Sequence, residues 1–293
     1  MPHGKPRQAT PLPRHVSPFP AETPGSYLRR LAQANHLSPE ALRGYIAGGR
    51  RNRPVPLSQL AIFAGVPASA LEHAIAAPEG GKPRMLYIGQ IPVHPHPAGP
   101  ACRLCALAHG ATLSQQIWCR THPEQVICLR HRRWIRSAAA TAQPCLDNQP
   151  DILQAHKRHL RLVRRLGREQ VMLGFAAAEH ICRQWHAQRQ HDEEPRRRMH
   201  IFHGCDQPPP AHDPTIAAAA YPQVVALARL LASPYRRSLA TGLPDAGEPS
   251  FALEVRKTVA PGYKWPSSRS STDPLYWWIT REHWQSLSGT APQ

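Results

Sequence analysis

The spacing of hydrophobic and polar positions predicts a pair of short helices near the N-terminus. Thr23 and Pro24 form a typical helix start, an N-cap residue followed by proline at the first helical position, and Asn35 can close the helix. Apolar residues recur there every three or four positions, whereas the other face is largely polar. The apolar positions are Tyr27, Leu28, Leu31 and Ala34, and the polar ones are Arg29, Arg30 and Gln33. A second helix is predicted to begin at Ser38-Pro39, to carry Leu42, Tyr45 and Ile46, and to end at residues 47–49.

Residues 56–75 predict a second helix pair with a sharp turn between its members. Gly65 permits a left-handed turn residue, and Ala61, four positions earlier, is small enough to let two helices cross closely. This is the layout of a helix-turn-helix, whose second helix would read DNA with Ser69, Ala70, Glu72 and His73. The alternative is a helical hairpin that only packs. The apolar positions are Leu57, Leu60, Ala61, Ala64, Leu71 and Ile75.

Further along, the pattern predicts a mainly α fold with Pro-rich irregular linkers and tails. A long helical pattern runs from residue 151 to about 190, is interrupted by Gly167, and is predicted to end at Pro195. Shorter helical patterns cover residues 222–233 and 274–284, and residues 85–91 resemble a short strand. The predicted organisation is a disordered tail (1–18), a helix-turn-helix-like domain (19–76), a linker (77–100), a zinc-binding module (101–136), a second linker (137–150), a basic helical region (151–235) and a mostly irregular C-terminal region (236–293).

The net charge of the chain indicates which class of partner it binds. Lys and Arg number 36 against 19 acidic residues, which gives a formal net charge of +17. Such an excess attracts polyanions, so nucleic acid is the expected partner and an anionic membrane surface is the alternative. No hydrophobic run approaches 18 residues, and the first residues lack the apolar stretch of a secretion signal, so we expect a cytoplasmic protein. Seven cysteines, an odd number, favour metal binding or burial over a disulfide framework.

Two closely spaced pairs of ligands predict a metal site. Cys102-x-x-Cys105 and Cys128-x-x-His131 are separated by 22 residues, and together they supply the four N and S ligands of a tetrahedral zinc. Four protein ligands leave no open position, so the expected Zn²⁺ is structural. Other residues that could substitute or bind metal are Cys119, His109 and His122, an unpartnered Cys145, and a cluster of His200, His203 and Cys205 for which chance is the favoured explanation.

Arginines surround the last of these ligands. Arg130, Arg132, Arg133 and Arg136 have no acidic residue beside them in the sequence. Because the guanidinium fork matches phosphate oxygens, they are candidate phosphate contacts, and a solvated basic face is the alternative. Trp118 and Trp134 are expected to pack against the zinc segment rather than to stack on bases.

Residues 156–168 carry six Lys or Arg and no acid. On a helix, Arg158, Arg161, Arg165 and Arg168 would fall on one stripe flanked by Lys157 and Arg164. Like charges placed in this way repel one another unless a polyanion relieves them. DNA-backbone binding is the favoured interpretation, ahead of docking to an acidic protein and of a merely solvated face.

Motifs of catalysis are missing from the sequence. There is no GxxxxGK[ST] phosphate loop, no GxSxG and no HExxH. The few acidic residues are scattered and suggest no carboxylate triad for a metal-dependent nuclease or transposase. We therefore expect a protein that is not an enzyme.

Two segments together resemble the TniQ family. FPAETPGSYLRRLAQANHLSPEAL is similar to that family's N-terminal motif, here through Glu22, Ser26, Tyr27, Leu28, Arg30, Leu31, Ala32 and Asn35. The order Cys102, Cys105, Trp118, Cys128, His131 is similar to its zinc segment, although Arg103 stands where the family often has Pro and a second zinc pair is missing. The resemblance covers roughly residues 15–136.

This resemblance implies a role in DNA transposition. TniQ-like proteins mark target DNA and recruit an AAA+ ATPase regulator that engages the transposase, and some dock on a CRISPR effector complex. The implied fold combines helix-turn-helix elements, a zinc-finger region and further helices. Two alternatives stay open on the residues themselves, a stand-alone helix-turn-helix transcriptional regulator with a structural zinc module and a protein-interaction scaffold.

Overall fold

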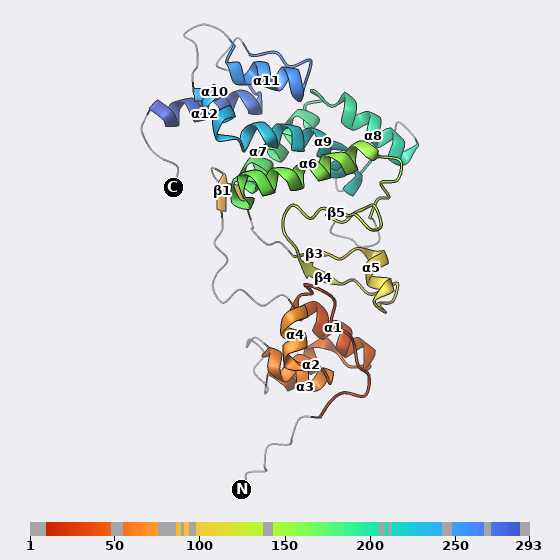
Figure 1. Ribbon diagram of the computed structural model, residues 1–293. Coiled ribbons are helices and arrows are strands. Elements are labelled where there is room, and N and C mark those ends of the chain that lie inside the picture. The colour runs from red at the N-terminus through yellow and green to blue at the C-terminus, as the bar shows by residue number, and fades with distance from the viewer. Residues whose placement is uncertain are drawn as a thin grey trace. The chain divides into compact units, whose positions relative to one another are not determined.

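Helices dominate the chain, as the periodicity predicts. The computed structural model describes residues 10–47, 55–75, 86–88, 91–93, 98–136, 143–204, 209–210, 213–241, 248–266 and 271–287. These residues form twelve helices and six short strands (Figure 1). The chain divides into two compact units, which are described separately. The first comprises Met1–Pro83, His96–His122 and Ile135–Gln143, and the second comprises Arg84–Pro95, Pro123–Trp134 and Pro144–Gln293.

Four helices at the N-terminus form the core of the first unit. They are α1 (Pro24–Ala34), α2 (Pro39–Ile46), α3 (Leu57–Ala64) and α4 (Ala68–Ala74). The predicted caps are confirmed, because the Thr23 side chain accepts a hydrogen bond from the backbone N–H of Ser26 and Ser38 does the same for Ala41. Gly65 ends α3 in the left-handed conformation (φ 65°), as predicted. The apolar faces meet in one cluster that includes Tyr27, Leu28, Leu31, Leu42, Ile46, Leu60, Ala61, Ala64, Leu71 and Ile75.

Three details of this unit differ from the sequence-based expectation. The pattern places Arg30 on the polar face of its helix, but its side chain is only 4% exposed, whereas Tyr45, which the pattern groups with Leu42 and Ile46, is 67% exposed. The predicted disordered tail was wrong for residues 10–18, because this segment packs on the helices. The Leu12 N–H donates to the Phe63 carbonyl at 2.9 Å, and the Tyr27 hydroxyl donates to the Val16 carbonyl at 2.8 Å.

A short β-hairpin and a helix complete the described part of the first unit. Strand β3 (Ala98–Pro100) pairs antiparallel with β4 (Trp118–Arg120), with Gly99 opposite Cys119. Helix α5 (Arg103–Ala108) lies between them in sequence. Ala101, Ala106, Ala111, Ile117 and Cys119 form a small apolar cluster of their own.

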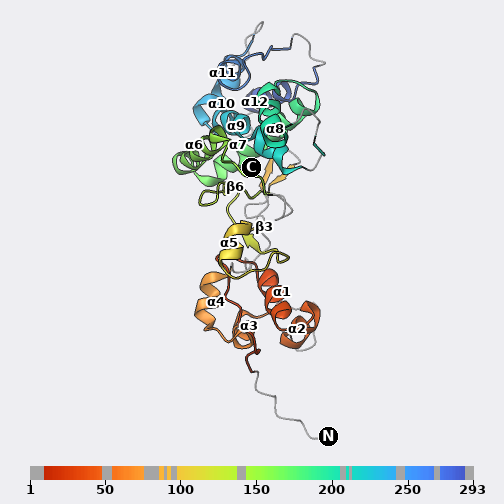
Figure 2. The ribbon, with the colours of Figure 1, turned by 90° about the vertical axis from the view of Figure 1, so that its right-hand side faces the viewer.

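Seven helices form most of the second unit, around a long central one. They are α6 (Pro150–Leu166), α7 (Arg168–Ala187), α8 (Glu193–His203), α9 (Pro214–Leu231), α10 (Pro234–Thr241), α11 (Ser250–Thr258) and α12 (Pro274–Leu287). Helix α9 packs against α6, α7 and α8, and Figures 1 and 2 both show it lying among them. Two short hairpins also belong here, β1 (Leu86–Ile88) with β2 (Ile91–Val93), and β5 (Ile127–Cys128) with β6 (Arg133–Trp134).

The apolar character of α9 is explained by its place in this core. By length and composition, this helix of 18 residues could cross a membrane, but 56% of it is buried inside the protein. Ala218, Tyr221, Leu227 and Leu230 are each at most 1% exposed. Helix α9 is therefore the core helix of this unit.

Helix boundaries in the second unit correct several predictions. Gly167 (φ 86°) separates α6 from α7, so the long helical pattern forms two helices. Pro195 does not end a helix; it lies in the first turn of α8, where proline needs no N–H partner. The C-terminal region, predicted to be mostly irregular, contains α11 and α12, and Phe251 and Ile279 of these helices are fully buried. The predicted linker 77–100 contains β1, β2 and β3 where it is described.

Candidate metal centre and basic surfaces

The four predicted ligands come from two tight turns of the backbone. Cys102 is the N-cap of α5, and Cys105 lies in the first turn of that helix. Cys128 ends β5, and His131 lies in the four-residue loop that joins β5 to β6. Gln143 fixes the start of α5, because its side chain accepts a hydrogen bond from the Arg103 N–H at 2.9 Å and donates one to the Ala101 carbonyl at 2.8 Å.

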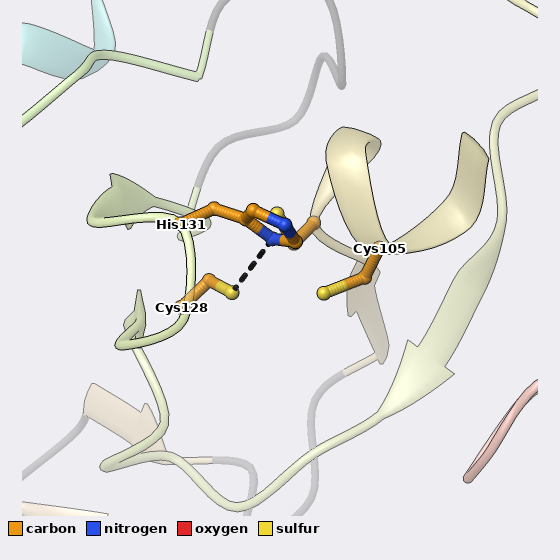
Figure 3. Close-up of side chains that lie close together, drawn as sticks. Cys105, Cys128 and His131 are labelled. Carbon is orange, nitrogen blue, oxygen red and sulfur yellow. Dashed lines mark hydrogen bonds between the residues drawn. The ribbon is translucent and has the colours of Figure 1, made fainter. Parts of the chain in front are cut away.

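The ligand atoms of these four residues converge. One side-chain atom from each of Cys102, Cys105, Cys128 and His131 lies within 4.8 Å of all the others. The Cys128 sulfur is 3.6 Å from Nδ1 of His131, and Figure 3 shows Cys105, Cys128 and His131 pointing toward one another. Cys102 is buried and the other three are partly exposed. This cluster can hold a metal ion, with three thiolates and one imidazole as ligands.

No family model, curated protein or solved structure matches this chain.

The residues considered as substitute ligands lie outside this cluster. Cys119 is 2% exposed in the apolar cluster of β4, and burial, reinforced by Glu22 and opposed by Arg30, raises the pKa of its thiol to about 12. His109 packs edge-on against the ring of Phe19 at 5.1 Å. Cys145 is exposed and donates from its sulfur to an Asp147 carboxylate oxygen at 3.1 Å. His122 is not part of the cluster either.

The second suspected metal cluster is not formed by the described residues. His203 accepts from or donates to the Thr215 hydroxyl at 2.9 Å and lies 3.7 Å from a carboxylate oxygen of Asp213, the N-cap of α9. His203 therefore supports a helix start. His200 lies on the same helix, α8, and Cys205 lies outside the described residues.

The arginines around the metal ligands have different surroundings. Arg130 and Arg136 are exposed, and Arg133 is half-buried in β6. Arg132 has an acidic neighbour after all, since its guanidinium lies 3.5 Å from Asp147, with both side chains 60% exposed. Such an exposed pair adds little stability. Trp134 is 1% exposed in the core cluster of the second unit, with its ring edge-on to Tyr221 of α9 at 5.1 Å, whereas Trp118 is partly exposed on β4. The packing of both rings against the zinc segment stays a prediction.

Helix α6 displays the predicted basic stripe with one correction. Arg168 does not belong to it, because this residue begins α7 and its Nε donates to the Glu124 carboxylate at 2.9 Å. The other cations are exposed on α6, and none forms an ion pair with any residue in the described part of the chain. They are Lys157, Arg158, Arg161, Arg164 and Arg165.

The opposite face of α6 is buried and includes two histidines beside apolar residues, which the sequence did not indicate. His156 and His159 are each 2% exposed, and both place Nδ1 within hydrogen-bonding distance of the Tyr221 hydroxyl, at 3.1 and 2.9 Å. The hydroxyl has one hydrogen, so it donates to one imidazole and can accept from the other. His159 also stacks on Phe175 with centroids 4.6 Å apart. These contacts fix the rotation of α6 and so direct its cations outward.

Helices α3 and α4 pack against each other across Gly65, in the order of a helix-turn-helix. The candidate DNA-reading residues of α4 are all exposed, namely Ser69, Ala70, Glu72 and His73. Helix α4 has seven residues and buries Leu71 against the core. The exposed residues are accessible, and their contact with DNA stays a prediction.

The N-terminal motif residues form a buried ion-pair network. The Glu22 side chain is fully buried and accepts two hydrogen bonds from the Arg30 guanidinium, at 3.0 and 2.8 Å. The Ser26 hydroxyl donates to the same carboxylate at 2.8 Å and accepts a bond from the Trp118 N–H at 3.0 Å. Single backbone bridges also pair Glu22 with Ile75 and with Cys119. These motif residues therefore join α1 to α4 and to the β3–β4 hairpin.

Proposed function

We propose that this chain is a non-catalytic DNA-binding adaptor of the TniQ type that acts in the cytoplasm. The observation that carries the proposal is the row of exposed cations on α6, without ion pairs among the described residues. Arg158, Arg161 and Arg165 extend over about 10 Å of helix. Duplex DNA presents one phosphate for about every 3.4 Å of axis on each strand, so several phosphates lie within reach of such a row.

The metal proposed for the cysteine and histidine cluster is one structural Zn²⁺. A tetrahedral zinc with Zn–S bonds of about 2.3 Å and a Zn–N bond of about 2.05 Å separates sulfur from nitrogen by about 3.6 Å. The separation between the Cys128 sulfur and His131 Nδ1 is 3.6 Å, which supports this choice. Three cysteines also favour zinc over the hard cations that prefer oxygen. When bound, the ion would hold two turns of the chain together and would leave no site for a substrate.

Each basic or exposed element has a role in this proposal. Helix α6 would neutralise phosphates and supply salt-sensitive affinity, Arg130 beside the metal cluster would bind a further phosphate, and the exposed side chains of α4 would supply any base-specific readout. The partner proposed from the TniQ resemblance is an AAA+ ATPase regulator, which would connect the DNA-bound chain to a transposase.

The first test measures DNA binding as a function of salt. Fluorescence anisotropy of a labelled duplex of about 30 base pairs, repeated between about 50 and 200 mM salt, gives the slope of log K against log salt. Replacing Arg161 and Arg165 by Ala should flatten the slope by about 0.9 for each phosphate that the variant no longer neutralises. The matched control is Arg197→Ala, because Arg197 is 62% exposed on α8 and is already paired with Glu194. An unchanged slope in the double variant would remove α6 from the DNA interface.

The second test identifies the partner. The tagged protein is captured from its native cells with nuclease treatment, and the proteins that stay bound are identified. An AAA+ ATPase or a transposase that survives nuclease supports the adaptor. DNA fragments without such a partner would favour the stand-alone transcriptional regulator, and neither DNA nor ATPase would favour an interaction scaffold.

A further inference from the structure

Arg229 lies at the end of an otherwise uncharged helix. Helix α9 has 18 residues, PTIAAAAYPQVVALARLL, and Arg229 is the single charged residue among them. Its neighbours Leu227, Ala228 and Leu230 are completely buried in the core, while Arg229 itself is exposed. A sequence search for basic runs does not find it, because it stands alone in an apolar segment.

The fold brings this residue to other arginines. Helix α9 packs against α6 and α10, and the positive charges of Arg236 on α10 and Arg158 on α6 both act on Arg229. Desolvation by the protein around the base of this exposed side chain, followed by these two charges, lowers the pKa of Arg229, although an arginine stays protonated at any physiological pH. Three helices thus place three guanidinium groups in one region of the second unit.

Among the described residues, one acidic group acts on Arg229, and this group already interacts with two other cations. It is the Glu254 carboxylate, which accepts a hydrogen bond from Arg236 at 2.8 Å and lies 3.8 Å from the Lys257 ammonium. Arg158 and Arg229 have no ion-pair partner anywhere in the described ranges. The folded chain therefore keeps three guanidinium groups near a single carboxylate that is already paired with Arg236, and an incoming anion would relieve the remaining repulsion.

We propose that Arg229 extends the cationic face of α6 onto α9, so that Arg158 and Arg229 together bind phosphate groups of a nucleic-acid backbone. The inference rests on the proposed DNA-binding function and deepens it, because it makes the interface a surface built by tertiary packing rather than a single helix. The guanidinium fork suits phosphate, and the regular cations of α6 suit a regularly spaced polyanion better than the irregular carboxylates of a protein.

The test compares four single substitutions by the same salt-series anisotropy. Arg229→Ala should weaken duplex binding several-fold at about 100 mM salt and lower the slope by about 0.9, as Arg158→Ala should. Arg229→Lys, which keeps the charge, should recover most of the slope. Arg197→Ala should leave it unchanged, and circular dichroism should show native helix content in all variants because the replaced side chains are exposed.

The outcomes separate this inference from the function on which it rests. If the wild-type chain does not bind the duplex, the proposed function fails before any variant is compared. If Arg158→Ala lowers the slope and Arg229→Ala leaves it at the wild-type value, the function stands and the extension onto α9 is refuted. If labelled polyglutamate binds more tightly than the duplex and loses affinity on Arg229→Ala, the surface serves an acidic protein and the nucleic-acid inference is overturned.

Discussion

Replacing Glu22 by Gln removes the negative charge from a buried ion pair of the first unit. The Glu22 carboxylate accepts four hydrogen bonds: two from Arg30, one from the Ser26 hydroxyl at 2.8 Å and one from the Phe19 N–H at 3.1 Å. Glutamine keeps the shape of the side chain and one of the two acceptor oxygens. The positive charge of Arg30, which is 4% exposed, then lacks its counterion.

The expected cost follows from this burial. Removing one partner of a buried ion pair destabilises a protein by about 3–5 kcal/mol, because the remaining charge is left without compensation. Since Gln still accepts hydrogen bonds at one oxygen, the lower end of about 3 kcal/mol applies. At about 1.36 kcal/mol for each factor of ten, this corresponds to an opening equilibrium roughly 150 times more populated.

Hydrogen exchange followed by mass spectrometry measures this opening in each unit separately. Amides of α1 should exchange about 100 times faster in Glu22→Gln, whereas amides of α9, in the other unit, should keep their rates. Glu40→Gln on α2 is the matched control, since Glu40 is exposed and forms no ion pair with the described residues. Adding Arg30→Met to Glu22→Gln should restore much of the protection, because no buried charge is left alone. Rates in α1 within about threefold of wild type would refute the reasoning.

Three further predictions concern other parts of the molecule. Purified protein should contain one zinc per chain by mass spectrometry; Cys105→Ser should lose it and Cys145→Ser should keep it. Burial lowers the pKa of His156 to about 4, below its usual 6.5, so the unfolded chain binds the extra proton and stability should fall by about 3 kcal/mol between pH 6.5 and 4. His156→Gln should lack this loss in urea titrations. Gly65→Ala should cost about 1–3 kcal/mol in the same titrations, because the added Cβ would lie 2.3 Å from the His15 ring at a positive φ.

Each of these three predictions would be contradicted by a specific result. Zinc retained by Cys105→Ser would overturn the ligand assignment. A stability that stays flat between pH 6.5 and 4 would show that His156 is not held neutral by its burial. An undiminished urea midpoint in Gly65→Ala would show that the turn relaxes without cost.

Local signals in the sequence determined the helices at the N-terminus and the metal cluster. Thr23, Ser38 and Gly65 act on the backbone within a few residues, so their caps and turn form as the sequence predicts. The Cys-x-x-Cys and Cys-x-x-His spacings are similarly local, because each pair occupies one turn. The joining of the two pairs could be predicted from the sequence because a tetrahedral metal requires four ligands.

Tertiary packing decided which charged side chains are buried and which are exposed, and the periodicity of the sequence does not predict this. Periodicity places Arg30 among polar residues, but its side chain is buried in an ion pair with Glu22. The pattern of α6 shows its cations, yet the Tyr221 hydroxyl that fixes the rotation of this helix is 62 residues from His159 in sequence. Arg229 stands alone in the sequence and meets other arginines only because α6, α9 and α10 pack together. The sequence by itself determined which residues could bind metal or phosphate, and long-range contacts decided which of them are exposed, because burial and ion pairing depend on residues far apart in the chain.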